Sequence, residues 1–89
     1  MRVQIRYLTY EIAKSFGSAE KSELLQLPSG AKYGALLDRF KGRIMPKGDG
    51  ERLMDSLVFI CNGRPLISIK DELVDSAFTI LVGYADTGG

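Results

Sequence analysis

Few residues in this chain have the types and spacing that chemistry requires. The 89 residues include no histidine, which is the commonest general base and a common metal ligand, and only one cysteine, Cys61. One cysteine cannot form an internal disulfide, and a chain without histidine lacks the usual parts of a hydrolytic centre or a zinc site. We therefore expect no metal site, and the remaining candidate is the end of the chain, at Gly88 and Gly89.

The two glycines allow chemistry that larger residues would block. Because glycine has no Cβ, an extended Gly88-Gly89 segment can pass through a narrow channel and present the carboxylate of Gly89 to a partner. A carboxylate does not react with sulfur or amine nucleophiles until it has been converted to an ester with a good leaving group. Since the chain has no catalytic constellation of its own, we expect a partner enzyme to perform that activation.

Cys61 is the other residue with intrinsic reactivity. It ends the apolar run Leu57 to Cys61, and no histidine or cluster of cations stands near it in the sequence to activate the thiol. We expect Cys61 to fill the core rather than to act in redox or thioester chemistry.

Composition and charge exclude several classes of function. The chain is 45% hydrophobic and 26% charged, which is ordinary for a soluble globular domain of this length. Its net charge of +1 supplies no field that would attract nucleic acid. The apolar runs are far shorter than the roughly 20 residues of a membrane-spanning helix, and the first residues do not resemble a signal peptide. We expect a cytoplasmic protein with no nucleic-acid or membrane partner.

One segment has the spacing of an amphipathic helix. Its apolar residues recur every three or four positions between charged ones, and they are Tyr33, Leu36, Leu37, Phe40 and Ile44. We predict a helix over residues 33–44, with Ser29 as its N-cap. The side chains expected to pack against the sheet residues Val3, Ile5, Phe59 and Ile80 are Leu36, Leu37 and Phe40. Gly34 costs about 1 kcal/mol in a helix interior relative to alanine, which indicates close backbone packing there or a later helix start.

Strand patterns occupy five other segments. These are residues 3–7, 23–28, 57–61, 64–69 and 78–82. Pro28 lacks a backbone donor and places the second strand at an edge, where it pairs with the first. The dipeptide Asn62-Gly63 favours a type I′ hairpin between the third strand and the fourth.

The remaining segments are predicted to be connections. Residues 12–17 fit a single helical turn, residues 45–55 contain two glycines, one proline and five charges and read as a loop, and residues 70–76 read as a turn. The order of elements predicts an α+β fold with a mixed sheet of about five strands packed on one main helix. Residues 1–84 would form one domain, and residues 85–89 a flexible tail.

Short motifs support a family resemblance. The sequence CNGRPL at 61–66, LVDS at 73–76 and the final TGG, together with the order of elements, resemble the MoaD/ThiS sulfur-carrier and ubiquitin-related-modifier family. The resemblance spans essentially the whole chain. It implies a ubiquitin-like β-grasp fold in which the first and last strands lie parallel at the centre of the sheet.

The same resemblance implies a function for the diglycine. An adenylating, ubiquitin-activating-like enzyme would use ATP to convert the Gly89 carboxylate to an acyl-adenylate, which a sulfur donor would turn into a thiocarboxylate for molybdopterin or thiamine synthesis or tRNA thiolation. The chain would then be a co-substrate or a synthase small subunit, not an enzyme, and would bind no cofactor itself. Two alternatives stay open, a modifier joined through Gly89 to lysine and a non-covalent ubiquitin-like binding module.

The resemblance also places a docking surface on the outer side of the sheet, for the activating enzyme or a synthase large subunit. In the strand 57–61, alternation puts Val58 and Ile60 on the side opposite to Leu57, Phe59 and Cys61, so they are candidates for that surface, with core burial as the alternative. Further candidates for partner contact, close to the diglycine, are Tyr84, Asp86 and Thr87. Lysines that a modifier could use for conjugation, although a solvated role is expected for each, are Lys14, Lys21, Lys32, Lys41, Lys47 and Lys70.

Overall fold

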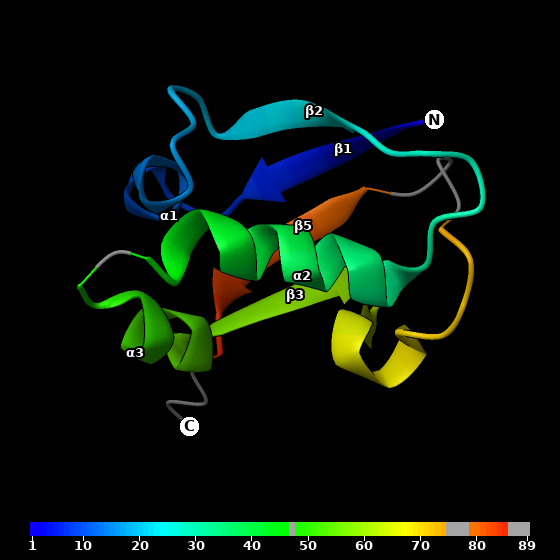
Figure 1. The fold of residues 1–89 in the computed structure, drawn as a ribbon. Helices are drawn as coiled ribbons and strands as arrows, with labels where there is room; N and C mark the ends of the chain where they lie inside the picture. Colours follow the sequence, from blue (N-terminus) through cyan, green and yellow to red (C-terminus); the bar gives the residue numbers. More distant parts are fainter. Residues whose placement is uncertain (47, 75–78, 86–89) are drawn as a thin grey trace.

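The structure, a computed structural model, describes residues 1–46, 48–74 and 79–85. Figure 1 shows the helices and strands along the chain. In order they are β1 (Arg2–Tyr7), α1 (Tyr10–Ser15), β2 (Ser22–Gln26), α2 (Tyr33–Ile44), α3 (Gly50–Ser56), β3 (Leu57–Cys61), β4 (Arg64–Pro65), the 3₁₀ helix η1 (Leu66–Ile69) and β5 (Ile80–Tyr84).

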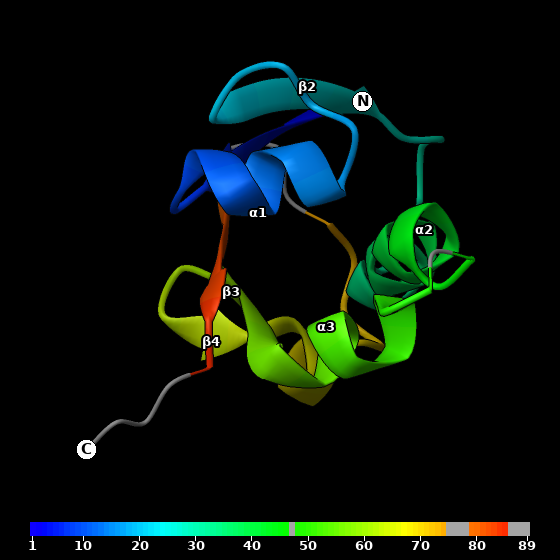
Figure 2. The ribbon, with the colours of Figure 1, turned by 90° about the vertical axis from the view of Figure 1, so that its left-hand side faces the viewer.

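The strands form one mixed sheet in the order β2-β1-β5-β3-β4. β1 and β5 run parallel at its centre, while the β1/β2, β3/β5 and β3/β4 pairs are antiparallel. Figure 1 shows α2 lying across one face of this sheet, and Figure 2 views the same arrangement almost along the axis of α2. The predicted mixed sheet on one main helix, with β2 at an edge, is confirmed.

The core lies between α2 and the inner face of the sheet. Along β1 the apolar residues of the alternating pattern are all buried, because one face of the strand meets the helix. From α2, Leu36 and Phe40 are both fully buried, and the Phe40 ring stacks on Phe59 with 4.8 Å between ring centroids. Leu37 is only partly buried, so its predicted place in the core is wrong.

Tertiary contacts, not a local cap, start α2. Its N-cap is Lys32, which makes no side-chain capping bond, so the prediction of Ser29 is wrong. The first two helical amides instead donate to the 70–72 turn, from Tyr33 to the Glu72 carbonyl at 3.1 Å and from Gly34 to the Lys70 carbonyl at 2.9 Å. A Cβ on Gly34 would lie 3.1 Å from that Lys70 oxygen, which confirms the close backbone packing inferred for this glycine.

The segment predicted as a loop over 45–55 contains α3. Gly50 opens this helix and is buried, and a Cβ there would lie 1.9 Å from the carbonyl oxygen of Ile44. The glycine that suggested a loop is therefore required for close approach of two helix ends. Leu53 and Met54 pack against the core from α3.

The hairpin after β3 is confirmed, but its second strand is shorter than predicted. Asn62 and Gly63 have φ angles of 52° and 79°, as a type I′ turn requires. The strand expected over 64–69 ends at Pro65, and η1 follows because Leu66 and Ile69 are buried three residues apart, which is the 3₁₀ period.

Candidate functional site

The end of β5 is the part of the described structure from which the diglycine segment begins. Tyr84 pairs with Leu57 of β3, and the Ala85 amide donates to the carbonyl oxygen of Ser56, at the end of α3, over 2.8 Å. These contacts tie the last described residue to the sheet and to α3. The residues predicted to carry the chemistry, Gly88 and Gly89, and the predicted contact residues Asp86 and Thr87, lie outside the described residues.

The predicted alternation along β3 is confirmed. Val58 and Ile60 are half-buried, whereas their neighbours Leu57, Phe59 and Cys61 are buried. Val58 and Ile60 therefore lie on the outer face of the sheet, where the sequence predicted candidate docking residues.

Two leucines extend this outer surface across the next strands. Leu81 of β5 lies beside Ile60 in the register and is 40% exposed. Leu8 follows β1, is 53% exposed and donates its amide to the Val82 carbonyl at 2.8 Å. A Cβ on Gly83 would lie 3.5 Å from Leu8 Cδ2, an ordinary van der Waals distance, which places the Leu8 side chain over β5 at Gly83. We refer to Leu8, Val58, Ile60 and Leu81 as the outer apolar band.

The sequence carried a signal for Leu8 that the strand prediction overlooked. Outward positions of β1 hold the polar residues Arg2, Gln4 and Arg6, and Leu8 continues the same phase with an apolar side chain. An apolar residue on the solvent phase of a strand indicates a second packing or binding surface.

Charge on the outer face has one sign. Arg6 lies beside Leu81 in the parallel register, and Arg2 is also outward on β1. Among the described strand residues on this face, none is aspartate or glutamate. The outward positions are Arg2, Gln4, Arg6, Ser22, Leu24, Gln26, Val58, Ile60, Pro65, Leu81 and Gly83. The apolar band is therefore bordered by positive charge.

Tyr84 does not join this band. Alternation along β5 puts Tyr84 on the same side as Val82, which faces the helices, and its side chain is 42% exposed. The structure therefore brings Val58 and Ile60 together and leaves Tyr84 on the opposite side of the sheet.

A polar network braces the sheet on the helix side. The Tyr7 hydroxyl donates to the Glu23 carboxylate, and Arg43 of α2 contacts the same carboxylate through Nη1 at 2.7 Å and donates from Nη2 to the Phe16 carbonyl. Burial raises the pKa of Tyr7 above its ordinary value, and Glu23 raises it further. Burial alone would raise the pKa of Glu23, but the hydrogen bonds from Arg43 and Tyr7 outweigh that effect and lower it.

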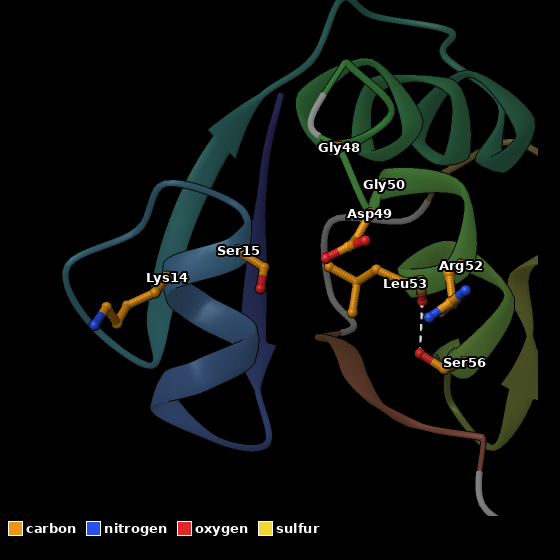
Figure 3. Close-up of a pocket in the computed structure, with 8 residues that line it drawn as sticks. All are labelled: Lys14, Ser15, Gly48, Asp49, Gly50, Arg52, Leu53 and Ser56. Atoms are coloured by element: carbon orange, nitrogen blue, oxygen red, sulfur yellow. Dashed lines mark hydrogen bonds between the residues drawn. The ribbon is translucent and has the colours of Figure 1, made fainter.

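A cleft of about 630 Å³ lies between α1 and α3 (Figure 3). Asp49 and Leu53 point from the α3 side toward α1, while Lys14 points away. Ser56 donates its hydroxyl to the Leu53 carbonyl within its own helix.

Cys61 is buried, and its Sγ lies 3.4 Å from the Tyr33 hydroxyl. This position agrees with the predicted role as core filler. Within the described ranges, no group of three potential metal ligands comes together, and no helix has the length and apolar character needed to cross a membrane.

Comparison with solved structures identifies the fold. The crystal structure of small archaeal modifier protein 1 from Haloferax volcanii matches with a TM-score of 0.63 over 100% of both chains at 19% identity. A second crystal structure of that protein matches with a TM-score of 0.59 over 92% of this chain and 94% of its own, at 18% identity. The chain has the ubiquitin-like β-grasp fold.

A structure assigned as molybdopterin converting factor subunit 1 from Pyrococcus furiosus has the same fold, with a TM-score of 0.60 over 94% of both chains at 20% identity. No protein-family model and no curated protein matches the sequence. The family resemblance noted from the sequence is thus matched by structural neighbours of both kinds, a modifier and a converting-factor subunit.

Proposed function

We propose that this β-grasp protein is a sulfur carrier or ubiquitin-like modifier whose Gly89 carboxylate is activated by a partner adenylating enzyme that consumes ATP. One observation carries the proposal. The central strand β5 leads within five residues of Tyr84 to Gly88-Gly89, in a fold shared with a modifier and a converting-factor subunit.

The proposed reaction has two steps. A carboxylate oxygen of Gly89 attacks the α-phosphorus of ATP, pyrophosphate leaves, and an acyl-adenylate forms. A hydrosulfide equivalent from a sulfur donor then attacks the acyl carbon, AMP leaves with its phosphate oxygen, and Gly89 carries a thiocarboxylate. The chain contributes the carboxylate and a segment narrow enough to enter the partner's site, since neither glycine has a side chain.

The outer apolar band supplies the docking surface in this proposal. Leu8 and Leu81 are exposed on the same face as Val58 and Ile60, and an exposed apolar cluster rimmed by polar residues is typical of a protein-binding surface. The positive border at Arg2 and Arg6 favours a partner surface that is apolar at its centre and acidic at its edge. We assign the adenylating enzyme, or a synthase large subunit, to this face.

The test is activation by the host's adenylating enzyme with ATP. We expect release of pyrophosphate and, when a sulfur donor is added, a mass change that corresponds to one sulfur replacing one oxygen. Deleting Gly89, or adding one residue after it, displaces the carboxylate by about 3.5 Å and should abolish both signals. A matched control adds one residue before Met1 and should leave both signals unchanged. Equal activation of the chain without Gly89 would refute the proposal.

The modifier form of the proposal predicts a different product from the same acyl-adenylate. An amine of a target lysine would replace AMP and form an isopeptide bond to Gly89, as the neighbour named a modifier suggests for this fold. Mass spectrometry of tryptic peptides separates the two outcomes, because only conjugation leaves residues 71–89, the segment after the last trypsin site at Lys70, joined through Gly89 to a lysine of another peptide. If the chain functions normally in cells without Gly88 and Gly89, the non-covalent binding module is the correct alternative.

A further inference from the structure

One edge of the sheet is open beside β3. β5 pairs with β3 along its whole length, from Leu57 to Cys61, but β4 pairs with it only at Ile60 and Cys61. β4 stops at Pro65 because η1 turns the chain away. In the part of the chain that the structure describes, residues 57–59 therefore have a strand on one side only, and an open strand edge is a template for another strand.

A groove of about 270 Å³ lies along this edge. Three consecutive residues, Leu57, Val58 and Phe59, all line it. Side chains of consecutive strand residues point to opposite faces, so a cavity that touches all three reaches the backbone edge of β3. We call this cavity, with its walls on α2, α3 and η1, the β3-edge groove.

The walls of the groove are mostly apolar. Leu37 of α2, Met54 of α3 and Ile67 of η1 contribute side chains to it. Ile67 is 71% exposed, the highest value among the large apolar side chains that the structure describes. The groove also accounts for Leu37, which has the helical phase of a core residue but faces this open space. Apolar side chains exposed to water beside an open strand edge indicate that a binding partner covers them.

We propose that the β3-edge groove binds an extended segment of a partner protein, which adds as a strand beside residues 57–59. The added strand would place apolar side chains at positions i and i+2 in the groove, against Leu37 and Ile67, while its backbone bonds to the β3 edge. This proposal stands apart from activation of Gly89, because it uses the backbone edge of β3 and not the tail, and it shares with the outer apolar band a single residue, Val58.

The shape of the site selects this occupant over others. The volume lies at the lower limit of the roughly 300 to 1,000 Å³ of small-molecule sites, and one or two side chains would fill it. α3 and the yellow η1 helix stand at the two ends of β3 in Figure 1. The free edge between them is about three residues long, roughly 10 Å, which admits a single strand but leaves little room for the broad surface of a second folded copy.

Random peptides displayed on phage and selected on the full chain provide the probe. Selected peptides are then synthesised and titrated into ¹⁵N-labelled protein. We expect them to share alternating apolar residues and to shift the backbone amides of Phe59 and Ile67. Methylation of the peptide's backbone nitrogens should abolish binding, because strand addition needs its N–H donors.

A matched pair of variants distinguishes binding in the groove from nonspecific binding to exposed apolar side chains. Ile67→Lys should weaken binding of the selected peptides at least about tenfold, whereas Leu73→Lys, at an equally apolar position that is 63% exposed and outside the groove, should not. Both side chains are exposed, so both variants should fold. The proposal is overturned if selection yields no peptide, if the peptides shift other surfaces, or if both variants bind alike. Pyrophosphate release with the adenylating enzyme, measured on Ile67→Lys, reports on the proposed function separately.

Discussion

Two adjacent leucines of α2 offer a direct test of the packing. Leu36 is fully buried, while Leu37 is partly buried and lines the β3-edge groove. Truncating either residue to alanine changes the helix propensity by the same small amount, so the difference between the variants reports on burial alone.

The expected magnitudes follow from that burial. Leu36→Ala removes fully buried methyl groups and leaves an enclosed cavity, which costs about 2 to 5 kcal/mol. Leu37 is only partly buried, so Leu37→Ala loses about half of the hydrophobic free energy of burying a leucine. The space that it leaves joins a groove that water already enters, so the cost is about 1 kcal/mol. A domain of this length has a free energy of unfolding of roughly 4 to 13 kcal/mol, so Leu36→Ala removes a large share of it.

Urea unfolding followed by circular dichroism measures both variants against the parent chain. The urea concentration at the unfolding midpoint should fall far more for Leu36→Ala than for Leu37→Ala. The dependence of the free energy of unfolding on urea should stay unchanged, which shows that unfolding exposes the same surface area in both variants. Equal losses, or a larger loss for Leu37→Ala, would show that α2 is rotated relative to the sheet and would refute the account of the groove as well.

Four further predictions test other parts of the structure. Gly50→Ala should lower the unfolding midpoint because its Cβ would lie 1.9 Å from the Ile44 oxygen, whereas Gly48→Ala, with no atom within 4 Å of its Cβ, should not. Leu8→Asp should slow pyrophosphate release with the adenylating enzyme at an unchanged melting temperature, while Leu73→Asp, at a similarly exposed leucine outside the strands of the sheet, serves as the control. The lowered pKa of Glu23 stabilises the fold above its ordinary value of 4.5, so the free energy of unfolding should fall as the pH drops below that value, and less so in Arg43→Met. Because the pKa of Tyr7 is raised in the folded state, the unfolded chain loses this proton first when the pH rises above 10.0. The free energy of unfolding should therefore fall in alkaline solution, and Tyr7→Phe should remove that loss.

Features that depend on neighbours in sequence were predictable. The alternation of β1, the helical period of α2 and the φ angles of Asn62 and Gly63 follow from residue types within a few positions of one another. The same local rule placed Val58 and Ile60 on the outer face, because alternation along one strand needs no knowledge of the rest of the fold.

Features that depend on distant partners were not predictable in the same way. The start of α2 is satisfied by the carbonyls of Lys70 and Glu72, which are more than 30 residues away in sequence, so no capping signature precedes the helix. Gly50 was read as a loop residue because the reason for a glycine there is the close contact with the Ile44 carbonyl oxygen, and only the folded chain brings Ile44 near.

The candidate site likewise has features that the sequence predicts and features that depend on the fold. The residue types by themselves determined that the chain lacks histidine, that it carries Gly88 and Gly89 after its last strand, and that both faces of β3 are apolar. Only the tertiary structure decided that Leu8 crosses Gly83 to complete the outer apolar band, and that β4 is too short to cover β3. The physical reason is that strand pairing and close backbone approach join residues far apart in the chain, where local periodicity carries no information about which surfaces remain uncovered.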